Sequence, residues 1–235
     1  MTAYMLQLFP ELTNVNGDAE NALVLARRAQ WAGLEAEVVP LAAGAAAPAL
    51  TPTAIVLGSG VDSSLERTRD ALEVLRGALT AWIADDIPVI AVGTGLELLG
   101  RSIQVGEVRL EGLGLFAGDA VALPARAAGE LLVDSAWGTL VGYENHARGF
   151  PLDGATALGT VLHGTGNGDG TDGIRSGSVF GTHLHGPVLA RNPAFATAVM
   201  AAAFGEGEDI YAPGRADSTA DLLRADAIRR LTKRS

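Results

Sequence analysis

Two histidines in the stretch GTHLHGP, residues 181–187, are the first candidates for chemistry in this sequence. Side chains two positions apart on a strand point to the same face, so we expect His183 and His185 to lie together if this stretch is extended. They could form a metal-binding pair, but no acidic cluster stands nearby at a suitable spacing. A histidine at the end of a strand, before Gly-Pro, is better placed to act as a general base. The sequence therefore favours proton transfer here, and we expect no metal site.

A second candidate is the turn in VIAVGTGLELLG, residues 89–100. The stretch is typical of a buried strand, a tight glycine turn and the start of a helix, which in many α/β enzymes presents a nucleophile at the edge of the sheet. Gly93, Thr94 and Gly95 occupy the turn, and the chain contains no cysteine. The missing cysteine excludes a thiol nucleophile, disulfides and thiolate metal sites. The turn could be a nucleophile elbow without its nucleophile, or only a tight turn in a sheet.

Two further stretches carry polar side chains or glycines in patterns that chemistry could use. In GYENHARG, Glu144 and His146 lie two apart, and a structural role in pinning a loop is as well supported as a catalytic one. The stretch HGTGNGDGTDG, residues 163–173, has glycines that could cradle a phosphate. It lacks the Gly-Lys-Ser/Thr ending of a P-loop and does not follow the first strand. We expect it to be a mobile surface loop without regular structure.

The elements that would position these residues alternate along the first half of the chain. Apolar runs predict strands over 4–9, 36–40, 53–57 and 88–92, and helical periodicity predicts helices over 19–33 and 66–85. Buried strands in this alternation predict a parallel sheet with helices on both faces. Shorter apolar runs between 102 and 159 meet at glycines and predict antiparallel or mixed strands. Helices are expected over 187–204, with an early interruption at Asn192-Pro193, and over 217–230. The absence of a repeat or linker predicts one domain, residues 1–235.

Composition narrows the possible partners. The chain has 235 residues, 48% of them hydrophobic, which is typical of a folded globular protein. Its 17 basic and 27 acidic residues give a net charge of −10, which argues against a nucleic-acid partner. No run of about 18 apolar residues appears, and residues 1–10 lack the pattern of a signal peptide. We therefore expect a soluble cytoplasmic protein without a transmembrane segment.

Seven stretches taken together are similar to one enzyme family over nearly the whole chain. In order they are LFPELTNVNGDAENALVLARRAQWAGLEAEVV, VLGSGVD, AVGTGLELLG, RAAGE, GYENHARG, GNGDGTDG and GTHLHGPVLARNP. They resemble the class I glutamine amidotransferases of the cobyric acid synthase type. The resemblance implies a flavodoxin-like fold with a mostly parallel sheet. Within the family, the sequence is most similar to the glutaminase subunits that pair with a MurT-like Mur ligase in the amidation of lipid II.

The resemblance also implies a reaction. In such enzymes a cysteine thiolate on the elbow attacks the glutamine side-chain amide, a histidine activates the thiolate, and backbone N–H groups stabilise the oxyanion. The resemblance places Gly93 at the nucleophile position and His185 at the base. Thr94 follows one residue too late to replace the cysteine, and Glu97 stands where the family has glutamine. The residues that the resemblance assigns to substrate binding are Gly58, Ser59, Gly60, Thr94 and Arg126.

Three functions follow as expectations. The first is a subunit that pairs with a MurT-like Mur ligase for peptidoglycan precursor amidation, with glutamine as a possible ligand and no cofactor. Its own glutaminase activity is doubtful because the cysteine is absent. The second is a non-catalytic pseudo-glutaminase that scaffolds or regulates its ligase. The third is a component of a cobyrinate-type amidotransferase.

Overall fold

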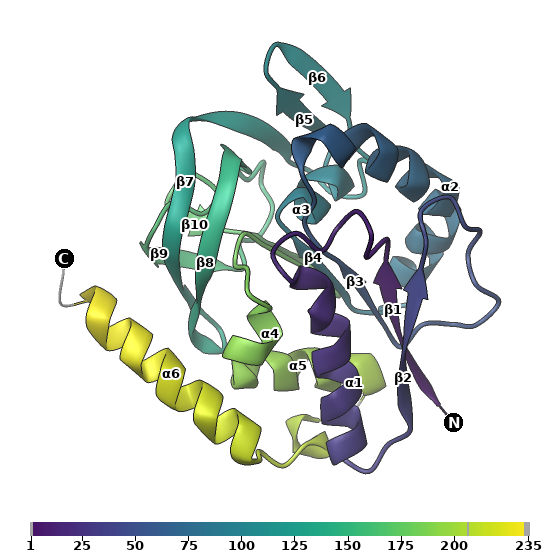
Figure 1. Cartoon of the computed structure of the whole chain (residues 1–235), viewed down its shortest axis with the longest axis vertical. Coiled ribbons are helices and arrows are strands. Elements are labelled where there is room, and N and C mark those ends of the chain that lie inside the picture. The colour runs from purple at the N-terminus through teal and green to yellow at the C-terminus, as the bar shows by residue number, and fades with distance from the viewer. Residues whose placement is uncertain (1, 206, 233–235) are drawn as a thin grey trace.

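The structure, a computed structural model, describes residues 2–205 and 207–232, and a six-stranded sheet forms its centre. The strand order is β11-β12-β4-β3-β1-β2, of which Figure 1 labels β4, β3, β1 and β2. All neighbours run parallel except β11, which pairs antiparallel with β12. The bounds are β1 Ala3–Leu8, β2 Ala36–Leu41, β3 Ala54–Leu57, β4 Val89–Val92, β11 Ile174–Ser176 and β12 Val179–Thr182. The four strands expected in the first half are confirmed to within one residue at most ends.

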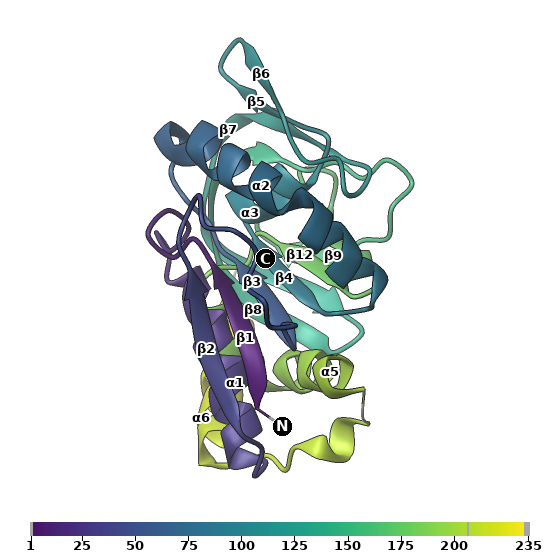
Figure 2. The ribbon, with the colours of Figure 1, turned by 90° about the vertical axis from the view of Figure 1, so that its right-hand side faces the viewer.

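Helices cover both faces of this sheet, as the buried strands predicted. Helix α2 (Leu65–Ala84) packs on one face, and α1 (Asn21–Trp31) and α5 (Pro193–Phe204) pack on the other (Figure 2). Successive residues of a strand point to opposite faces. Ile55 and Leu57 of β3 accordingly join the α2 core, whereas Ala54 and Val56 join the core with α1 and α5. Burial on both faces explains the unbroken apolar run of this strand.

The middle of the chain forms a second, mostly antiparallel sheet, which confirms the mixed strands expected there. Its path is β10-β9-β7-β5-β6, with β8 also paired to β7, and only β5 and β7 run parallel. Figure 2 shows the β5–β6 hairpin projecting from the body of the molecule. The bounds are β5 Ser102–Val105, β6 Val108–Glu111, β7 Asp119–Ser135, β8 Gly138–Gly149, β9 Gly159–His163 and β10 Thr171–Asp172.

The helical segment expected over 187–204 is divided in two at Asn192 and Pro193, where the sequence indicated an interruption. The structure has a short α4 (Val188–Arg191) and a separate α5. Proline disfavours the helical conformation of the residue before it, and Asn192 accordingly has φ −130° and ψ 79°. Its side-chain amide donates to the carbonyl oxygens of Val141 and Val188, at 2.9 and 2.8 Å. The break therefore ties the helices to β8.

The remaining helical segments are three 3-10 turns and the helices α3 and α6. Short 3-10 turns span Asp18–Glu20, Asp62–Ser64 and Glu208–Ile210, and α3 spans Thr94–Leu99 directly after β4. The last helix, α6 (Arg215–Thr232), lies along the outside of the molecule (Figure 1). Among the described residues, no helix combines the length and the apolar character needed to cross a membrane.

Candidate functional site

Gly93 forms a sharp elbow between β4 and α3 at the carboxyl end of the sheet. Its φ of 53° and ψ of −119° lie in a region that residues with a side chain rarely adopt. The elbow is held by backbone hydrogen bonds, since the Gly93 N–H donates to Thr182 and its carbonyl accepts from Glu97. A Cβ added to Gly93 would lie 3.0 Å from Cε1 of His185. The structure therefore brings together the two residues that the sequence placed at the nucleophile and base positions.

His185 is fully buried and is held by a carboxylate from the first loop of the chain. Its Nδ1 lies 2.9 Å from Oδ2 of Asp18, and its backbone N–H donates to the carbonyl of Tyr143. Asp18 is also buried, and Asn16 Nδ2 lies 3.4 Å from each ring nitrogen. A carboxylate at Nδ1 fixes the ring and leaves Nε2 as the basic nitrogen. The geometry is that of an oriented general base.

Ser59 occupies the space that a side chain at position 93 would need. Its Oγ lies 2.7 Å and its Cβ 3.0 Å from the place of a Cβ on Gly93. The Ser59 hydroxyl makes only long contacts among the described residues, 3.4 Å to the Thr94 N–H and 3.5 Å to the Thr94 hydroxyl. A side chain at position 93 would therefore contact Ser59 closely, and one of the two would have to shift.

Thr94 also turns inward and contacts the loop Gly58-Ser59-Gly60, which follows β3. Its hydroxyl oxygen accepts the Gly60 N–H at 2.8 Å. In enzymes with a nucleophile elbow, the oxyanion hole uses the N–H after the nucleophile and an N–H from a neighbouring loop. The corresponding groups here are the N–H groups of Thr94 and Gly60, and both face hydroxyls of the chain itself. An oxyanion would have to displace these hydroxyls before it could bind.

A pocket of about 280 Å³ opens beside the elbow. It contains Ser59, Gly60, Thr94 and Arg126, four of the five residues expected to bind substrate. Arg126 is exposed and donates to the side-chain oxygen of Asn145 at 2.9 Å. Gly58 does not line this pocket, because it packs beneath the first loop, where a Cβ would overlap the carbonyl oxygen of Thr13. Close packing of the two backbones therefore requires glycine at this position.

A buried arginine connects helix α3, which follows the elbow, to the 3-10 turn Asp62–Ser64. Arg148 Nε donates to Glu97 at 2.8 Å, and its two terminal nitrogens donate to Asp62 at 3.1 and 2.8 Å. Burial lowers the pKa of Arg148, but the hydrogen bonds and charges of Asp62 and Glu97 outweigh it, so the net shift of the pKa is upward. The acidic residue at 97, where the resemblance implies glutamine, is therefore paired with Arg148.

His183 and His185 do not share a face, contrary to the expectation from sequence. Strand β12 ends at Thr182, so both histidines lie beyond it. His183 Nδ1 lies 3.2 Å from Asp172, and its ring stacks on that of His146, with centroids 4.2 Å apart. His185 instead turns to Asp18. The two rings thus contact different carboxylates, Asp172 and Asp18. Among the described residues, no group of three or more possible ligands is placed to hold a metal.

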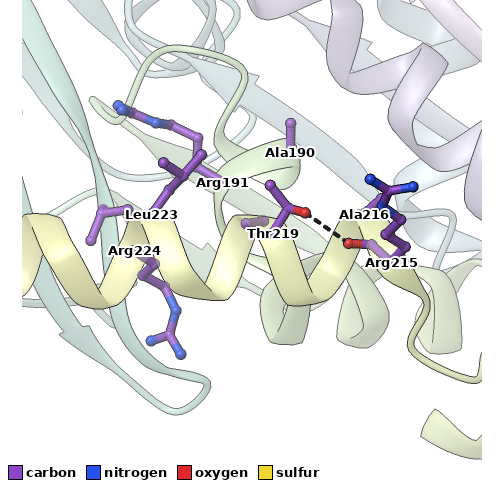
Figure 3. Close-up of a pocket in the computed structure, with 9 residues that line it drawn as sticks. Ala190, Arg191, Arg215, Ala216, Thr219, Leu223 and Arg224 are labelled. Carbon is purple, nitrogen blue, oxygen red and sulfur yellow. Dashed lines mark hydrogen bonds between the residues drawn. The ribbon is translucent and has the colours of Figure 1, made fainter.

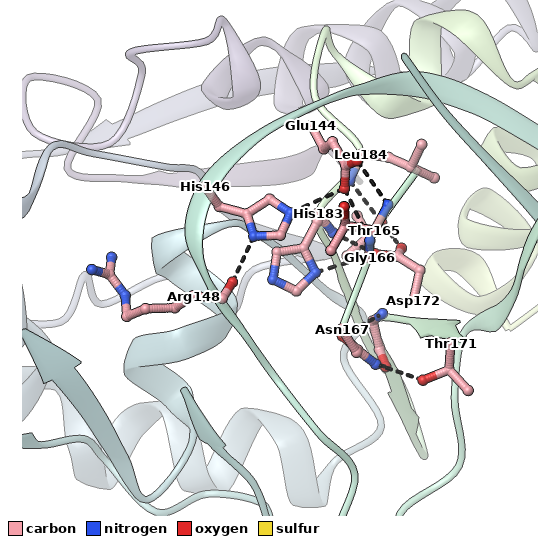
Figure 4. A network of polar contacts seen from close by, with 12 residues as sticks. Glu144, His146, Arg148, Thr165, Gly166, Asn167, Thr171, Asp172, His183 and Leu184 are labelled. Carbon is pink, nitrogen blue, oxygen red and sulfur yellow. Dashed lines mark hydrogen bonds and ion pairs between the residues drawn. The ribbon is translucent and has the colours of Figure 1, made fainter. Parts of the chain in front are cut away.

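Glu144 and His146 have a structural role in this fold (Figure 4). Glu144 accepts the backbone N–H groups of Thr165 and Gly166 at 2.8 and 2.9 Å, and His146 Nε2 lies 3.1 Å from it. Burial raises the pKa of Glu144, but these three hydrogen bonds outweigh it and hold the pKa below its usual value. Of the two roles that the sequence left open, the geometry supports loop pinning.

The loop that Glu144 pins is not the mobile surface loop expected over 163–173. Asn167 is buried, and its side chain both donates to and accepts from the backbone of Gly173, at 2.9 and 3.0 Å. Two of its residues, Thr171–Asp172, form strand β10. Glycines allow the tight backbone turns here, but buried hydrogen bonds then fix the loop in place.

Comparison with known proteins shows the family of the chain that carries this elbow and histidine. A profile of the CobB/CobQ-like glutamine amidotransferase domain matches residues 10–193. The chain belongs to this family. The match runs from the loop that carries Asp18 through the elbow at Gly93 to the segment that carries His185. The family resemblance expected from sequence is confirmed.

Two named relatives are subunits of one enzyme. The chain is 30% identical over 183 residues to the lipid II isoglutaminyl synthase (glutamine-hydrolyzing) subunit GatD of Staphylococcus aureus, covering 76% of this chain and 75% of that one. It is 28% identical over 219 residues to the GatD subunit of Streptococcus pneumoniae, covering 89% and 84%.

Solved structures support the fold. A chain of PurLQS from Thermotoga maritima superposes with a TM-score of 0.54 at 14% identity, covering 97% of this chain and 100% of that one. A glutamine amidotransferase from the same organism gives 0.56 at 14% identity, covering 99% and 97%. The expected glutamine amidotransferase-like α/β fold is confirmed.

Sequence reasoning missed Asp18 as the partner of His185. The stretch NVNGDAEN contributed to the family resemblance, but nothing in it pairs an aspartate with a histidine 167 residues away. The available signal was a carboxylate in a glycine turn just beyond the first strand, at the edge of the sheet where ligands of α/β folds bind.

Proposed function

We propose that this chain is a GatD-like subunit that pairs with a MurT-like Mur ligase in the amidation of lipid II, and that it does not itself hydrolyse glutamine. The similarity to two GatD subunits over three quarters or more of the chain supports the subunit role. One observation carries the second half of the proposal. The elbow holds Gly93 beside the His185–Asp18 pair, and Ser59 lies within 3.0 Å of the place that a Cβ at position 93 would take.

The expected chemistry explains why this arrangement matters. Hydrolysis through the family mechanism needs a covalent bond between the substrate carbonyl and a side chain at position 93. Glycine supplies no atom for that bond. His185 could at most assist attack by water, and the oxyanion donors at Gly60 and Thr94 already contact hydroxyls. Ammonia for the ligase would then come from solution rather than from glutamine.

The test is reconstitution of the chain with the MurT-like ligase of the same organism. We expect amidation of lipid II with ammonium chloride as the nitrogen source and no more than a trace with glutamine. Glutamate release, measured without lipid II, should stay at background. Amidation with glutamine as fast as with ammonium would overturn the non-hydrolysing half of the proposal. No amidation with either source would overturn the subunit role.

A further inference from the structure

A groove on the side of the molecule formed by α1, α4 and α6 has no part in the site described above. Two hollows of about 520 and 240 Å³ flank three alanines, Ala190, Ala216 and Ala220, which line both of them. Figure 3 shows the larger hollow, where α6 runs beneath the end of α4. The smaller one lies between α6 and the outer face of α1. Together they form one groove along α6.

The groove has exposed apolar walls. Trp31 at the end of α1 lines the smaller hollow and is 59% exposed, while Leu223 of α6 lines the larger one and is 68% exposed. Leu23 of α1, which also lines the smaller hollow, is 42% exposed. Single exposed leucines are ordinary, but a tryptophan and two leucines around one groove form the kind of surface that partners cover. Tryptophan and arginine are also the residues most enriched among binding hot spots.

The rim of the groove is positively charged in a chain whose net charge is −10. Arg27, Arg191 and Arg215 line it, and none of the three forms an ion pair within the described part of the chain. The carboxylates nearby are already neutralised, since Asp217 pairs with Arg28 and Asp221 with Arg224. Three uncompensated positive charges therefore surround the apolar surface.

The groove is preformed because α6 is anchored beside it. Asp217, in the first turn of α6, is buried and accepts hydrogen bonds from Arg28, from the Tyr211 hydroxyl at 2.6 Å and from the Gly214 N–H at 2.7 Å. A surface that is already ordered loses little conformational entropy when a partner binds.

We propose that this groove docks an acidic amphipathic helix of the partner ligase, an inference that rests on the proposed function. A helix fits because the groove is lined by α6 over 215–224 and by α1 over 23–31, with the small side chains of Ala190, Ala216 and Ala220 at its floor, which leave room for the side chains of a docked helix. Acidic side chains on its flanks would meet the three arginines. Figure 3 shows Arg191 and Arg215 directed to different sides of the hollow, which favours an extended anionic partner over a small anion.

A second copy of the chain is a poorer occupant on grounds of charge. A two-fold interface places the same patch on both sides, so the arginine rim would face itself. Like charges at such an interface are destabilising, whereas an acidic partner removes the repulsion.

The test measures binding of the ligase to the wild-type chain and to two groove variants, Arg191→Glu/Arg215→Glu and Leu223→Asp. We expect each variant to weaken the equilibrium dissociation constant by roughly tenfold or more, because charge reversal and a buried carboxylate both oppose binding. Added salt should weaken binding of the wild type and should affect the charge-reversed variant less. The matched controls are Arg67→Glu and Val74→Asp on α2, exposed positions on the opposite side of the sheet, which should bind as the wild type does.

The outcomes separate this inference from the proposed function. If the wild-type chain and ligase do not associate, the proposed function fails and takes the inference with it. If they associate and the groove variants bind as tightly as the controls, only the inference fails. Dimerisation of the chain alone that the groove variants abolish would assign the groove to a second copy instead. Circular dichroism of each variant, expected to match that of the wild type, excludes loss of the fold as the cause.

Discussion

At the scale of single residues, the candidate site has a histidine paired with a carboxylate and no side chain at the elbow. His185 and Asp18 are paired at 2.9 Å, and both side chains are buried. Gly93 relieves the backbone strain that any other residue would carry at a φ of 53°. Ser59 then fills the space beside it. Two neighbouring residues, Gly93 and Ser59, therefore determine the shape of the elbow.

The first prediction concerns recovery of the nucleophile. Gly93→Cys alone should recover little glutaminase activity, because its Cβ would lie 2.7 Å from the Ser59 oxygen. Gly93→Cys/Ser59→Gly should recover more, with glutamate release rising by on the order of 10²-fold over the wild type. His185→Ala in that background should abolish the gain. The cysteine should also lower the free energy of unfolding by about 1–3 kcal/mol, measured by urea denaturation. Equal activity of the single and double variants would show that Ser59 is no obstacle.

At the scale of elements, two buried carboxylates hold two segments in place: the loop over 163–173 and helix α6. The sequence does not indicate where either segment packs. Glu144 on β8 holds the glycine-rich loop through the N–H groups of Thr165 and Gly166. Asp217 on α6 holds that helix to α1 through Arg28. Each satisfies backbone or side-chain donors that would otherwise be buried without a partner, and such donors are costly to leave unpaired.

The second prediction tests the role of Glu144. Glu144→Ala should lower the free energy of unfolding by about 1–3 kcal/mol, since two buried N–H groups lose their acceptor. Hydrogen exchange at Thr165 and Gly166 should become faster, while exchange in the central sheet should not change. Glu107→Ala in the exposed β5–β6 turn is the matched control and should leave both measurements unaltered. Unchanged exchange at Thr165 and Gly166 in Glu144→Ala would contradict the loop-pinning role.

The third prediction is a pH dependence that comes from Asp217. Burial raises the pKa of this carboxyl, but the hydrogen bonds from Tyr211, Gly214 and Arg28 outweigh it, so its folded pKa lies below the ordinary value. A carboxyl with a lowered folded pKa adds stability that is complete above the unfolded pKa of about 4 and is lost as the pH falls through the folded pKa. Asp217→Asn should therefore melt below the wild type at pH 7. The difference should shrink as the pH is lowered from about 4 toward 2. A constant difference across this range would rule out the charge as its source.

At the scale of the whole molecule, the second sheet helps to position His185, which follows strand β12 of the central sheet. Strand β8 pairs with the segment after β12, where the N–H of His185 donates to the carbonyl of Tyr143 at 2.8 Å. The close approach depends on Gly142, where a Cβ would lie 2.8 Å from Leu184 and 3.0 Å from the carbonyl oxygen of His185. The two sheets therefore meet at the site itself.

The fourth prediction follows from this close contact. Gly142→Val should lower the free energy of unfolding by about 1–3 kcal/mol through overpacking. In the Gly93→Cys/Ser59→Gly background it should also reduce glutaminase activity, because β8 would push His185 away from the elbow. Gly129→Val on β7, where a Cβ meets nothing within 4 Å, is the matched control. If both valines lower activity equally, the contact at Gly142 does not position His185.

The sequence by itself determined the alternating elements, the elbow at Gly93, the missing thiol and the family. These properties depend on local periodicity and on residue types at short spacing, which a single chain displays directly. Only the tertiary structure decided the partner of His185, the separation of His183 from it, and the filling of the elbow by Ser59. Each of these depends on residues that are distant in the chain and meet only where strands and loops converge at one edge of the sheet. Contacts of that kind leave no local pattern, so the fold must be built before they can be seen.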